Sequence, residues 1–254
     1  MNDVSDSEKE RKVRSDKGHI MATKRDIYIM QWIAEQYAVR FDQLQKLLSR
    51  FPDKHKPFKS KLIAETTVKD QIARWQRAGW IEYRRVLADG RGYAWVTKKG
   101  LALVELDEIY TARTPAPTRL NHIYAVNQVR LWMDLQGFVW TSERRYRSQL
   151  EKGKKGESTG PIPDAVVIHA KYGKVAIEVE LTAKKPVDLL DKIENLVRAS
   201  GLDSSTLHYV NTFPVVWFYV PNENIKGLIE SACEKLNEKE QGRVSAGVQD
   251  NLIA

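Results

Sequence analysis

The sequence predicts a mixed helix-and-strand chain, of the α+β or α/β class, that is built in two parts. Helical periodicity followed by a glycine-rich hairpin fills the first hundred residues. After residue 119 we expect a helix, three strands, a helix and a strand, and a stretch with two prolines separates the two parts. The expected organisation is a flexible tail over 1–22, a first domain over 23–108, a linker over 109–118, a second domain over 119–240 and a flexible tail over 241–254.

Composition excludes several classes of protein. Apolar residues make up 42% and charged residues 29% of the chain, close to the average of globular proteins. Cys233 is the only cysteine, so a disulfide framework and a cysteine-based metal site are excluded. The sequence lacks an apolar run long enough to span a bilayer, and its first residues lack the apolar stretch of a secretory signal. We therefore expect a cytoplasmic protein without a membrane partner.

Positive charge is concentrated in one segment. The formal net charge is +8, and residues 24–100 alone contain 17 lysines and arginines against 8 aspartates and glutamates. The remainder of the chain is nearly balanced. Clustered positive charge is the electrostatic feature that a polyanionic partner such as DNA requires.

Two helices and a loop are expected at the start of the first part. Thr23 is placed to cap a helix over residues 24–36, and a second helix is expected over 41–48. The basic segment 50–61 contains two prolines, so we expect it to form a loop.

A third helix presents a polar and basic face. It begins near Thr66 or Thr67 and ends at Gly79. Val68, Ile72 and Trp75 recur at helical spacing and are expected to face inward. The residues left facing outward are Lys69, Asp70, Arg74 and Arg77.

A hairpin follows this helix, with strands over 80–87 and 93–96 and a turn over 88–92. Thr97 then caps a helix over 98–107. Three helices followed by a hairpin resemble the winged-helix fold, which lays its third helix in the major groove of DNA. Two alternatives stay open: a winged helix that contacts proteins, and a basic face that is only solvated. The residues that the resemblance places on DNA are Thr67, Lys69, Arg74, Arg77, Arg84 and Arg91.

The second part has a different order of elements. A segment low in apolar residues, 151–160, is expected to be mobile. The expected elements are a helix over 120–135, strands over 138–146, 162–170 and 174–182, a helix over 186–200, a strand over 215–220 and a helix over 222–239. This αβββαβ order is similar to that of the PD-(D/E)XK, or restriction-endonuclease-like, fold.

Two glutamates stand inside an apolar strand of this part. Alternation along a strand puts Glu178 and Glu180 on the same face. A three-residue turn would pair Ala170 with Lys174 and set Asp164 opposite Glu180 on that face. A two-residue turn would put Asp164 on the other face, because a slip of one residue reverses every side chain.

Three carboxylates on one face repel one another, which raises the pKa of at least one of them. A Mg²⁺ or Mn²⁺ ion held by Asp164, Glu178 and Glu180 would relieve this repulsion and could activate a water against a phosphodiester. The alternative is that the glutamates form an ordinary solvated sheet face.

Further side chains are expected near the same face. Glu143, in the first strand of the second part, could reach the carboxylates from the neighbouring strand. His122 and His169 are each either a base or a packed, hydrogen-bonded residue. The side chains that could hold phosphates there are Arg144, Arg145 and Arg147.

Short motifs spread over residues 24–220 form a recognisable set. They are Lys24-Arg25-Asp26, Phe41-Asp42-Gln43-Leu44, His122 with Val126-Asn127-Gln128-Val129-Arg130-Leu131, Trp140-Thr141-Ser142-Glu143-Arg144, Pro163-Asp164-Ala165, and Glu178-Val179-Glu180-Leu181-Thr182 with Lys184. In these motifs the chain resembles the replication-relaxation family of plasmids and other mobile elements. The resemblance implies a winged helix joined to a restriction-endonuclease-like domain, with roles in replication, mobilisation or regulation of mobile DNA.

The wider PD-(D/E)XK pattern asks for Asp and then Glu-x-Lys. Asp164 and Glu178 match its acidic positions, but Glu180 stands where the lysine is expected. Lys184 either replaces that lysine or contacts phosphate or solvent. The residues given a catalytic role are Asp164, Glu178, Glu180, Lys184 and Glu143.

Two functions therefore stand side by side. The first is a Mg²⁺- or Mn²⁺-dependent DNA endonuclease or nickase whose winged helix selects the site on double-stranded DNA. The second is a non-catalytic DNA-binding accessory factor or transcriptional regulator that keeps the nuclease-like fold as a scaffold. A protein-binding adaptor is a third. A second copy of the chain and replication or mobilisation proteins are the further partners expected.

Overall fold

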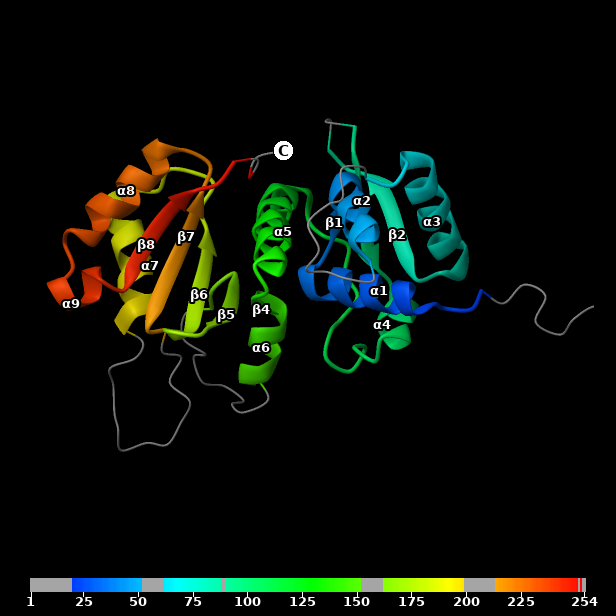
Figure 1. The fold of residues 1–254 in the computed structure, drawn as a ribbon, viewed down its shortest axis with the longest axis horizontal. Helices are drawn as coiled ribbons and strands as arrows, with labels where there is room; N and C mark the ends of the chain where they lie inside the picture. The colour runs from blue at the N-terminus through cyan, green and yellow to red at the C-terminus, as the bar shows by residue number, and fades with distance from the viewer. Residues whose placement is uncertain are drawn as a thin grey trace, which may run out of the picture.

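The chain folds into a mixed α and β structure with two sheets (Figure 1). The computed structural model describes residues 20–51, 62–87, 90–151, 162–198, 213–250 and 252. One sheet has three strands in the order β1-β3-β2, and the other has five in the order β4-β5-β6-β7-β8. Most of the expected tail over 1–22, of the basic loop over 50–61 and of the segment over 151–160 lies outside the described residues, as does part of the turn over 88–92.

The N-terminal half confirms the three expected helices and the hairpin. Its elements are α1 (Lys24–Gln36), β1 (Val39–Arg40), α2 (Phe41–Arg50), α3 (Glu65–Ala78), β2 (Ile81–Arg85), β3 (Gly92–Val96) and α4 (Lys98–Leu103). Thr23 caps α1 as expected, because its hydroxyl accepts a hydrogen bond from the Asp26 amide. The short strand β1 was not expected, and it extends the hairpin by pairing with β3.

A buried carboxylate joins α1 to α3. Asp26 has no solvent exposure and accepts hydrogen bonds from Trp75 Nε1 at 2.7 Å and from Arg74 Nη1 at 2.9 Å. Burial alone would raise the pKa of Asp26, but hydrogen bonds from Thr23, Trp75 and Arg74 lower it overall. Arg74 therefore turns back onto α1. The periodicity of α3 had predicted that Arg74 faces outward, and this prediction was wrong.

The C-terminal half is built around the five-stranded sheet. Its elements are the short 3-10 helix η1 (Pro117–Arg119), α5 (Leu120–Leu135), β4 (Val139–Ser142), α6 (Glu143–Glu151), β5 (Ala165–His169), β6 (Gly173–Val179), α7 (Pro186–Arg198), β7 (Val215–Val220), α8 (Glu223–Cys233), α9 (Glu238–Gln241) and β8 (Val244–Val248). Strands β4, β5 and β6 pair antiparallel, whereas β6, β7 and β8 pair parallel.

Helices cover both faces of this sheet. On one face, α7 and α8 bury the alternate residues Val216, Phe218 and Val220 of β7. On the other face, α5 packs against β5 and β6, with Val129 and Met133 in one apolar cluster with the strand residues. Figure 1 shows α5 standing between this sheet and the N-terminal half.

Several expected boundaries were wrong, among them that of the helix expected over 98–107, which ends at Leu103. The strand expected over 138–146 ends at Ser142, and α6 begins at Glu143 because the Ser142 hydroxyl accepts from the Arg145 amide and caps the helix. The tail expected from residue 241 instead contains β8, whose parallel pairing with β7 supplies hydrogen bonds that its short sequence pattern did not indicate. The expected helix over 222–239 is divided into α8 and α9.

The register of the β5–β6 hairpin differs from the expected one by two residues. His169 pairs with Gly173, and Ala165 pairs with Ile177, so the turn spans residues 170–172. Gly173 adopts a positive φ of 69°, a conformation that glycine tolerates and that suits the closing position of a three-residue turn. Extending this register places Asp164 opposite Glu178 rather than Glu180. The shift is even, so the faces stay as predicted.

Helix α5 belongs to the apolar cores of both halves. Its residue Leu131 lies in the core cluster of the N-terminal helices, while Val129 lies in the cluster under the sheet. Buried polar contacts reinforce the packing. Asn127 Nδ2 donates to the Ala38 carbonyl at 2.8 Å, and Arg50 Nη1 donates to the Leu131 carbonyl at 2.8 Å. None of the helices in the described ranges is both long and apolar enough to cross a membrane.

Replacing Asn127 with Ala should weaken this junction. The buried Ala38 carbonyl would be without this hydrogen-bond donor and Gln43 Oε1 would keep only the Arg40 amide, which should lower the free energy of unfolding by about 1–3 kcal/mol. Urea denaturation of the whole chain measures this decrease. Asn121→Ala, at an exposed position of the same helix, is the matched control. Equal stability of the two variants would contradict this role of Asn127.

Candidate functional site

The predicted carboxylates lie together where β5 and β6 meet. Asp164 directly precedes β5, Glu178 lies within β6 and Glu180 follows it. Their side chains are only 18%, 4% and 7% exposed, respectively. Asp164 Oδ2 accepts a hydrogen bond of 2.8 Å from the Val179 amide, which fixes Asp164 against the neighbouring strand. The carboxylates are therefore buried rather than on a solvated sheet face.

Lys192 on α7 supplies positive charge to this cluster, and the sequence analysis did not identify it. Its Nζ lies 2.7 Å from Glu178 Oε2 and 3.5 Å from Glu180 Oε2. Lys192 lies three residues after buried Leu189 and four before buried Leu196, so it shares the inward face of α7. A lysine among the apolar positions of α7 was the sequence feature that could have identified Lys192. Lys184, which was predicted, forms an ion pair with Glu180, four residues before it in the sequence.

The environment separates the pKa values of the two central carboxyls. Burial and the nearby charge of Asp164 raise the pKa of Glu178 to about 8. Burial also acts to raise the pKa of Asp164, but the hydrogen bond and charge of His122 outweigh it and hold that pKa below its ordinary value. For Lys192, burial is outweighed by the carboxylates, chiefly Glu178 and then Asp164, and its pKa is raised. The environment thus favours the ionised form of Asp164 and disfavours that of Glu178.

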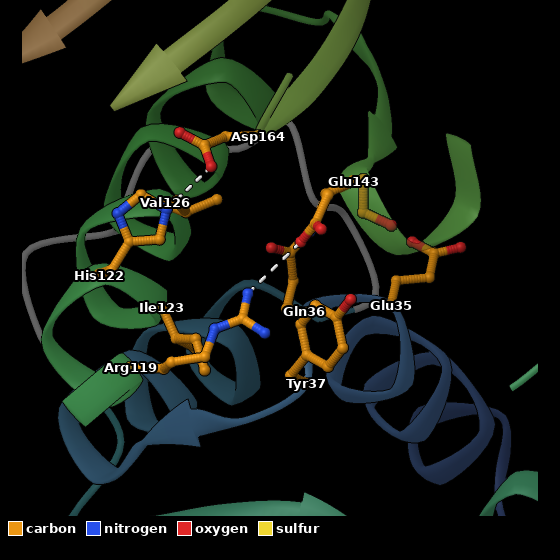
Figure 2. A pocket seen from close by; sticks show the side chains of 10 residues that line it. Glu35, Gln36, Tyr37, Arg119, His122, Ile123, Val126, Glu143 and Asp164 are labelled. Carbon is orange, nitrogen blue, oxygen red and sulfur yellow. Dashed lines mark hydrogen bonds and ion pairs between the residues drawn. The ribbon is translucent and has the colours of Figure 1, made fainter. Parts of the chain in front are cut away.

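His122 connects α5 to the carboxylates. Its Nε2 donates to Asp164 Oδ1 at 2.8 Å (Figure 2). Burial would lower the pKa of His122, but the hydrogen bond and charge of Asp164 raise it overall. His169 lies elsewhere, with its ring stacked on Tyr172 at 4.8 Å between centroids and near Phe138 at 5.9 Å. Of the two histidines considered, only His122 contacts the cluster.

Glu143 lines a small pocket that also reaches Asp164. The pocket holds about 20 Å³ and is bounded in addition by Tyr37 and His122. Glu143 Oε1 accepts from Arg147 at 2.7 Å. Figure 2 shows the second contact of Glu143, in which Oε2 lies 3.6 Å from Arg119. The Glu143 amide donates to the Asp164 carbonyl at 3.0 Å. Glu143 is therefore adjacent to the site, but its charge is compensated by two arginines.

The three carboxylates expected to hold a metal ion lie close together and also contact cationic side chains. Within the described ranges, no group of three or more His, Cys, Asp and Glu side chains is placed to hold a metal ion. Lysines and His122 already contact the carboxylate oxygens. Asp164 and Glu178 lie opposite each other at neighbouring strands, so two carboxylates still stand side by side as oxygen donors for a cation.

The residues expected to contact DNA lie on two elements, helix α3 and the β2–β3 hairpin. Thr67, Lys69 and Arg77 are exposed on α3, and Lys69 makes only a loose ion pair with Glu65, at 3.8 Å. Arg74 is half-buried and paired with Asp26, as described above. On the hairpin, Arg84 is exposed and pairs with Glu82 at 2.6 Å, and Arg91 is exposed just before β3.

Comparison with models of protein families, with curated proteins and with solved structures gives no match to this chain.

The Asp164–His122 pair should be visible in the titration of His122. Replacing Asp164 with Asn removes the anion that raises the pKa of His122, so burial dominates and that pKa should fall. Nuclear magnetic resonance of the imidazole carbons measures the midpoint, with the signal of His169 as an internal control for wider changes. An unchanged His122 midpoint in Asp164→Asn would contradict the contact.

The same shifts set the pH range in which the pair stabilises the fold. The pKa of His122 is raised, so its contribution is fully present below the unfolded value of about 6.5 and is lost as pH rises through the folded pKa. The pKa of Asp164 is lowered, so its contribution is present above about 3.9 and is lost as pH falls through the folded pKa. Asp164→Asn should therefore cost most stability between these values, as urea denaturation across pH can test.

Proposed function

We propose that the chain is a DNA-binding protein whose N-terminal half is a winged helix and whose C-terminal half is a PD-(D/E)XK nuclease-like domain that hydrolyses phosphodiesters with a divalent cation. The observation that carries the proposal is the group formed by buried Glu178 with half-buried Asp164 and Lys192, where α7 packs beside two neighbouring strands. It provides two acidic groups and one lysine, the side-chain types that the nuclease pattern requires.

Burial of so much charge favours a functional role. Removing carboxylates and an ammonium from water costs free energy that their mutual attraction repays only in part. Strongly perturbed carboxyls in a polar cluster are typical of catalytic sites. Here the environment moves the pKa values of Asp164 and Glu178 in opposite directions, while both side chains stay on one sheet face. Two apolar side chains in place of the charged ones would stabilise the fold at least as well, if the role of the cluster were only structural.

Asp164 and Glu178 fit a Mg²⁺ or Mn²⁺ ion as its carboxylate ligands. Mg²⁺ in proteins often uses only one or two carboxylates and keeps several waters, so a third protein ligand is not required. When bound, the ion would supply activation of a water and neutralisation of charge on a phosphodiester. Glu180, in the third predicted ligand position, is held by Lys184 and Lys192 and is assigned to positioning these lysines.

Two side chains of this site have roles of their own. Lys192 takes the part of the lysine that the pattern lacks at position 180, because its ammonium lies against Glu178 and can bind a phosphate oxygen or orient a water. His122 keeps Asp164 ionised and oriented by donating to Oδ1. The other Asp164 oxygen, Oδ2, is bound to the Val179 amide.

The N-terminal half supports DNA binding through the position of its charge. The order α1, α2, α3, β2, β3 is that of a winged helix, and the exposed side of α3 carries Thr67, Lys69 and Arg77. Three residues from separate replication-relaxation motifs, His122, Asp164 and Glu178, meet at one site. This convergence supports the proposal that the chain belongs to that family.

A second function is favoured by a different observation. Each carboxylate already has a cation or a hydrogen-bond donor, and no three-ligand metal group is found in the described part of the chain. The alternative is therefore a DNA-binding accessory factor or regulator in which the cluster only stabilises the sheet.

Cleavage of supercoiled plasmid in Mg²⁺ or Mn²⁺ separates the two functions. Asp164→Asn and Glu178→Gln should each reduce nicking by on the order of 100-fold, because each removes a carboxylate that would be a ligand of the cation. Lys192→Gln should reduce nicking while leaving duplex binding intact. Lys239→Ala, at an exposed position of α9, is the control and should cleave like the wild type. If the wild type binds duplex but never nicks it, the accessory function is correct and the nuclease proposal fails.

Duplex binding should depend on the exposed face of α3. The double variant Lys69→Ala with Arg77→Ala should weaken binding at all sequences, and it should reduce the slope of log affinity against log salt by about one for each phosphate that is no longer neutralised. Gel shift at several salt concentrations measures this, again with Lys239→Ala as the control. An unchanged slope in the double variant would show that α3 does not contact DNA.

A further inference from the structure

An arginine-lined pocket lies beside the candidate site, at the junction of the two halves. Its volume is about 170 Å³, whereas a single water needs only about 10–15 Å³. Arg113 lines it from the segment after α4, Arg144 and Arg147 line it from α6, and Tyr37 and Tyr110 complete the wall. Among the residues described there, no aspartate or glutamate lines it. We propose that this pocket binds a phosphate group.

Arg144 is built into the wall as a fixed cation. Its Nη1 donates to the Ala34 carbonyl at 2.7 Å, its Nη2 donates to the Thr111 carbonyl at 2.5 Å, and its Cζ lies 4.3 Å from the centre of the Tyr110 ring. Carbonyls and rings orient the guanidinium without neutralising it, and within the described ranges Arg144 makes no ion pair. Burial lowers the pKa of Arg144, so the pocket favours a compensating anion.

Arg113 and Arg147 add two further guanidinium groups. Arg144 and Arg147 are three residues apart on α6 and therefore share one helix face. Arg113 is exposed and makes no ion pair with the described residues, which leaves its planar fork available to a tetrahedral anion. Arg147 also donates to Glu143, which lines the neighbouring pocket with Asp164. The two pockets thus adjoin through Tyr37 and the Glu143–Arg147 pair.

Tyr110 provides a second indication of a ligand. Its side chain is buried, Arg145 lies near its hydroxyl as a donor, and none of the described residues accepts a hydrogen bond from that hydroxyl. Buried hydroxyls in proteins are nearly always hydrogen-bonded, so an acceptor is missing at this position. A phosphate oxygen in the pocket would be such an acceptor. Tyr37, which lines both pockets, has a positive φ of 68°, an unfavourable conformation for a bulky residue and a kind of strain that clusters at functional sites.

The phosphate could come from two sources with the same chemistry. One is a phosphodiester within a DNA strand that passes over the junction toward the carboxylates. The other is a phosphomonoester, at the end of a DNA strand or on a small molecule. Neither requires a metal ion or cleavage, so the pocket is testable whether or not the nuclease proposal holds.

Titration calorimetry of the whole chain with inorganic phosphate, at constant ionic strength and without divalent cations, tests the site. Arg113→Ala should weaken binding by about tenfold or more, as expected when one charge-assisted hydrogen bond is removed. Tyr110→Phe keeps the ring and removes only the hydroxyl, and it should also weaken binding. Lys239→Ala should bind like the wild type. If the wild type binds no phosphate, or if Arg113→Ala and Tyr110→Phe bind it as the wild type does, the proposal is overturned.

Duplexes with and without a 5′-phosphate then identify the source. If the 5′-phosphate strengthens binding and Arg113→Ala removes that gain, the pocket takes a terminal monoester. If Arg113→Ala weakens both duplexes equally, it takes a backbone diester. If Arg113→Ala affects inorganic phosphate but neither duplex, the ligand is a small phosphate compound. These outcomes are measured by binding alone. The phosphate-binding proposal can therefore hold even if the protein never cleaves DNA.

Discussion

The structure depends on α5 being buried on two sides. Its apolar residues pack under the five-stranded sheet and into the core of the N-terminal helices, and Asn127 and Arg130 add hydrogen bonds or ion pairs to the N-terminal half. The helix that stabilises the junction also carries His122 to Asp164. A change in how the N-terminal half sits on α5 would therefore reach the carboxylate cluster directly, which gives the DNA binding proposed for one half a physical route to the chemistry proposed for the other.

The carboxylate cluster stabilises the fold at the place where we propose that chemistry occurs. Buried Glu178 and half-buried Asp164 lie against Lys192 and His122, and each carboxylate is stabilised by a cation or a donor. The charges of this group are compensated without a ligand, yet a bound cation would compete with Lys192 for Glu178. Lys192 lies on α7, so its flexible side chain can move away from Glu178 while the strands stay in place. We infer that this exchange allows one arrangement to be both a stable fold and a metal-dependent site.

Sequence patterns located the carboxylates but not all of their partners. Alternation placed Asp164, Glu178 and Glu180 on one face correctly, because side-chain direction depends only on strand parity. The exact register was wrong because the closing Gly173 moves the turn by one position. Lys192 was missed because a lysine within a helix is usually solvated, and its burial follows only from tertiary packing. Arg74 was misjudged for the same reason, since periodicity cannot show that a guanidinium turns back to Asp26.

The central claim is that Asp164 and Glu178 together bind one divalent cation. Electron paramagnetic resonance of Mn²⁺ titrated into the whole chain tests it without requiring a DNA substrate. We expect one site in the wild type, strongly weakened in Glu178→Gln and in Asp164→Asn and retained in Lys239→Ala. A wild type that binds no Mn²⁺, or a Glu178→Gln variant that binds it as well as the wild type, would show that the cluster is structural and does not bind a cation.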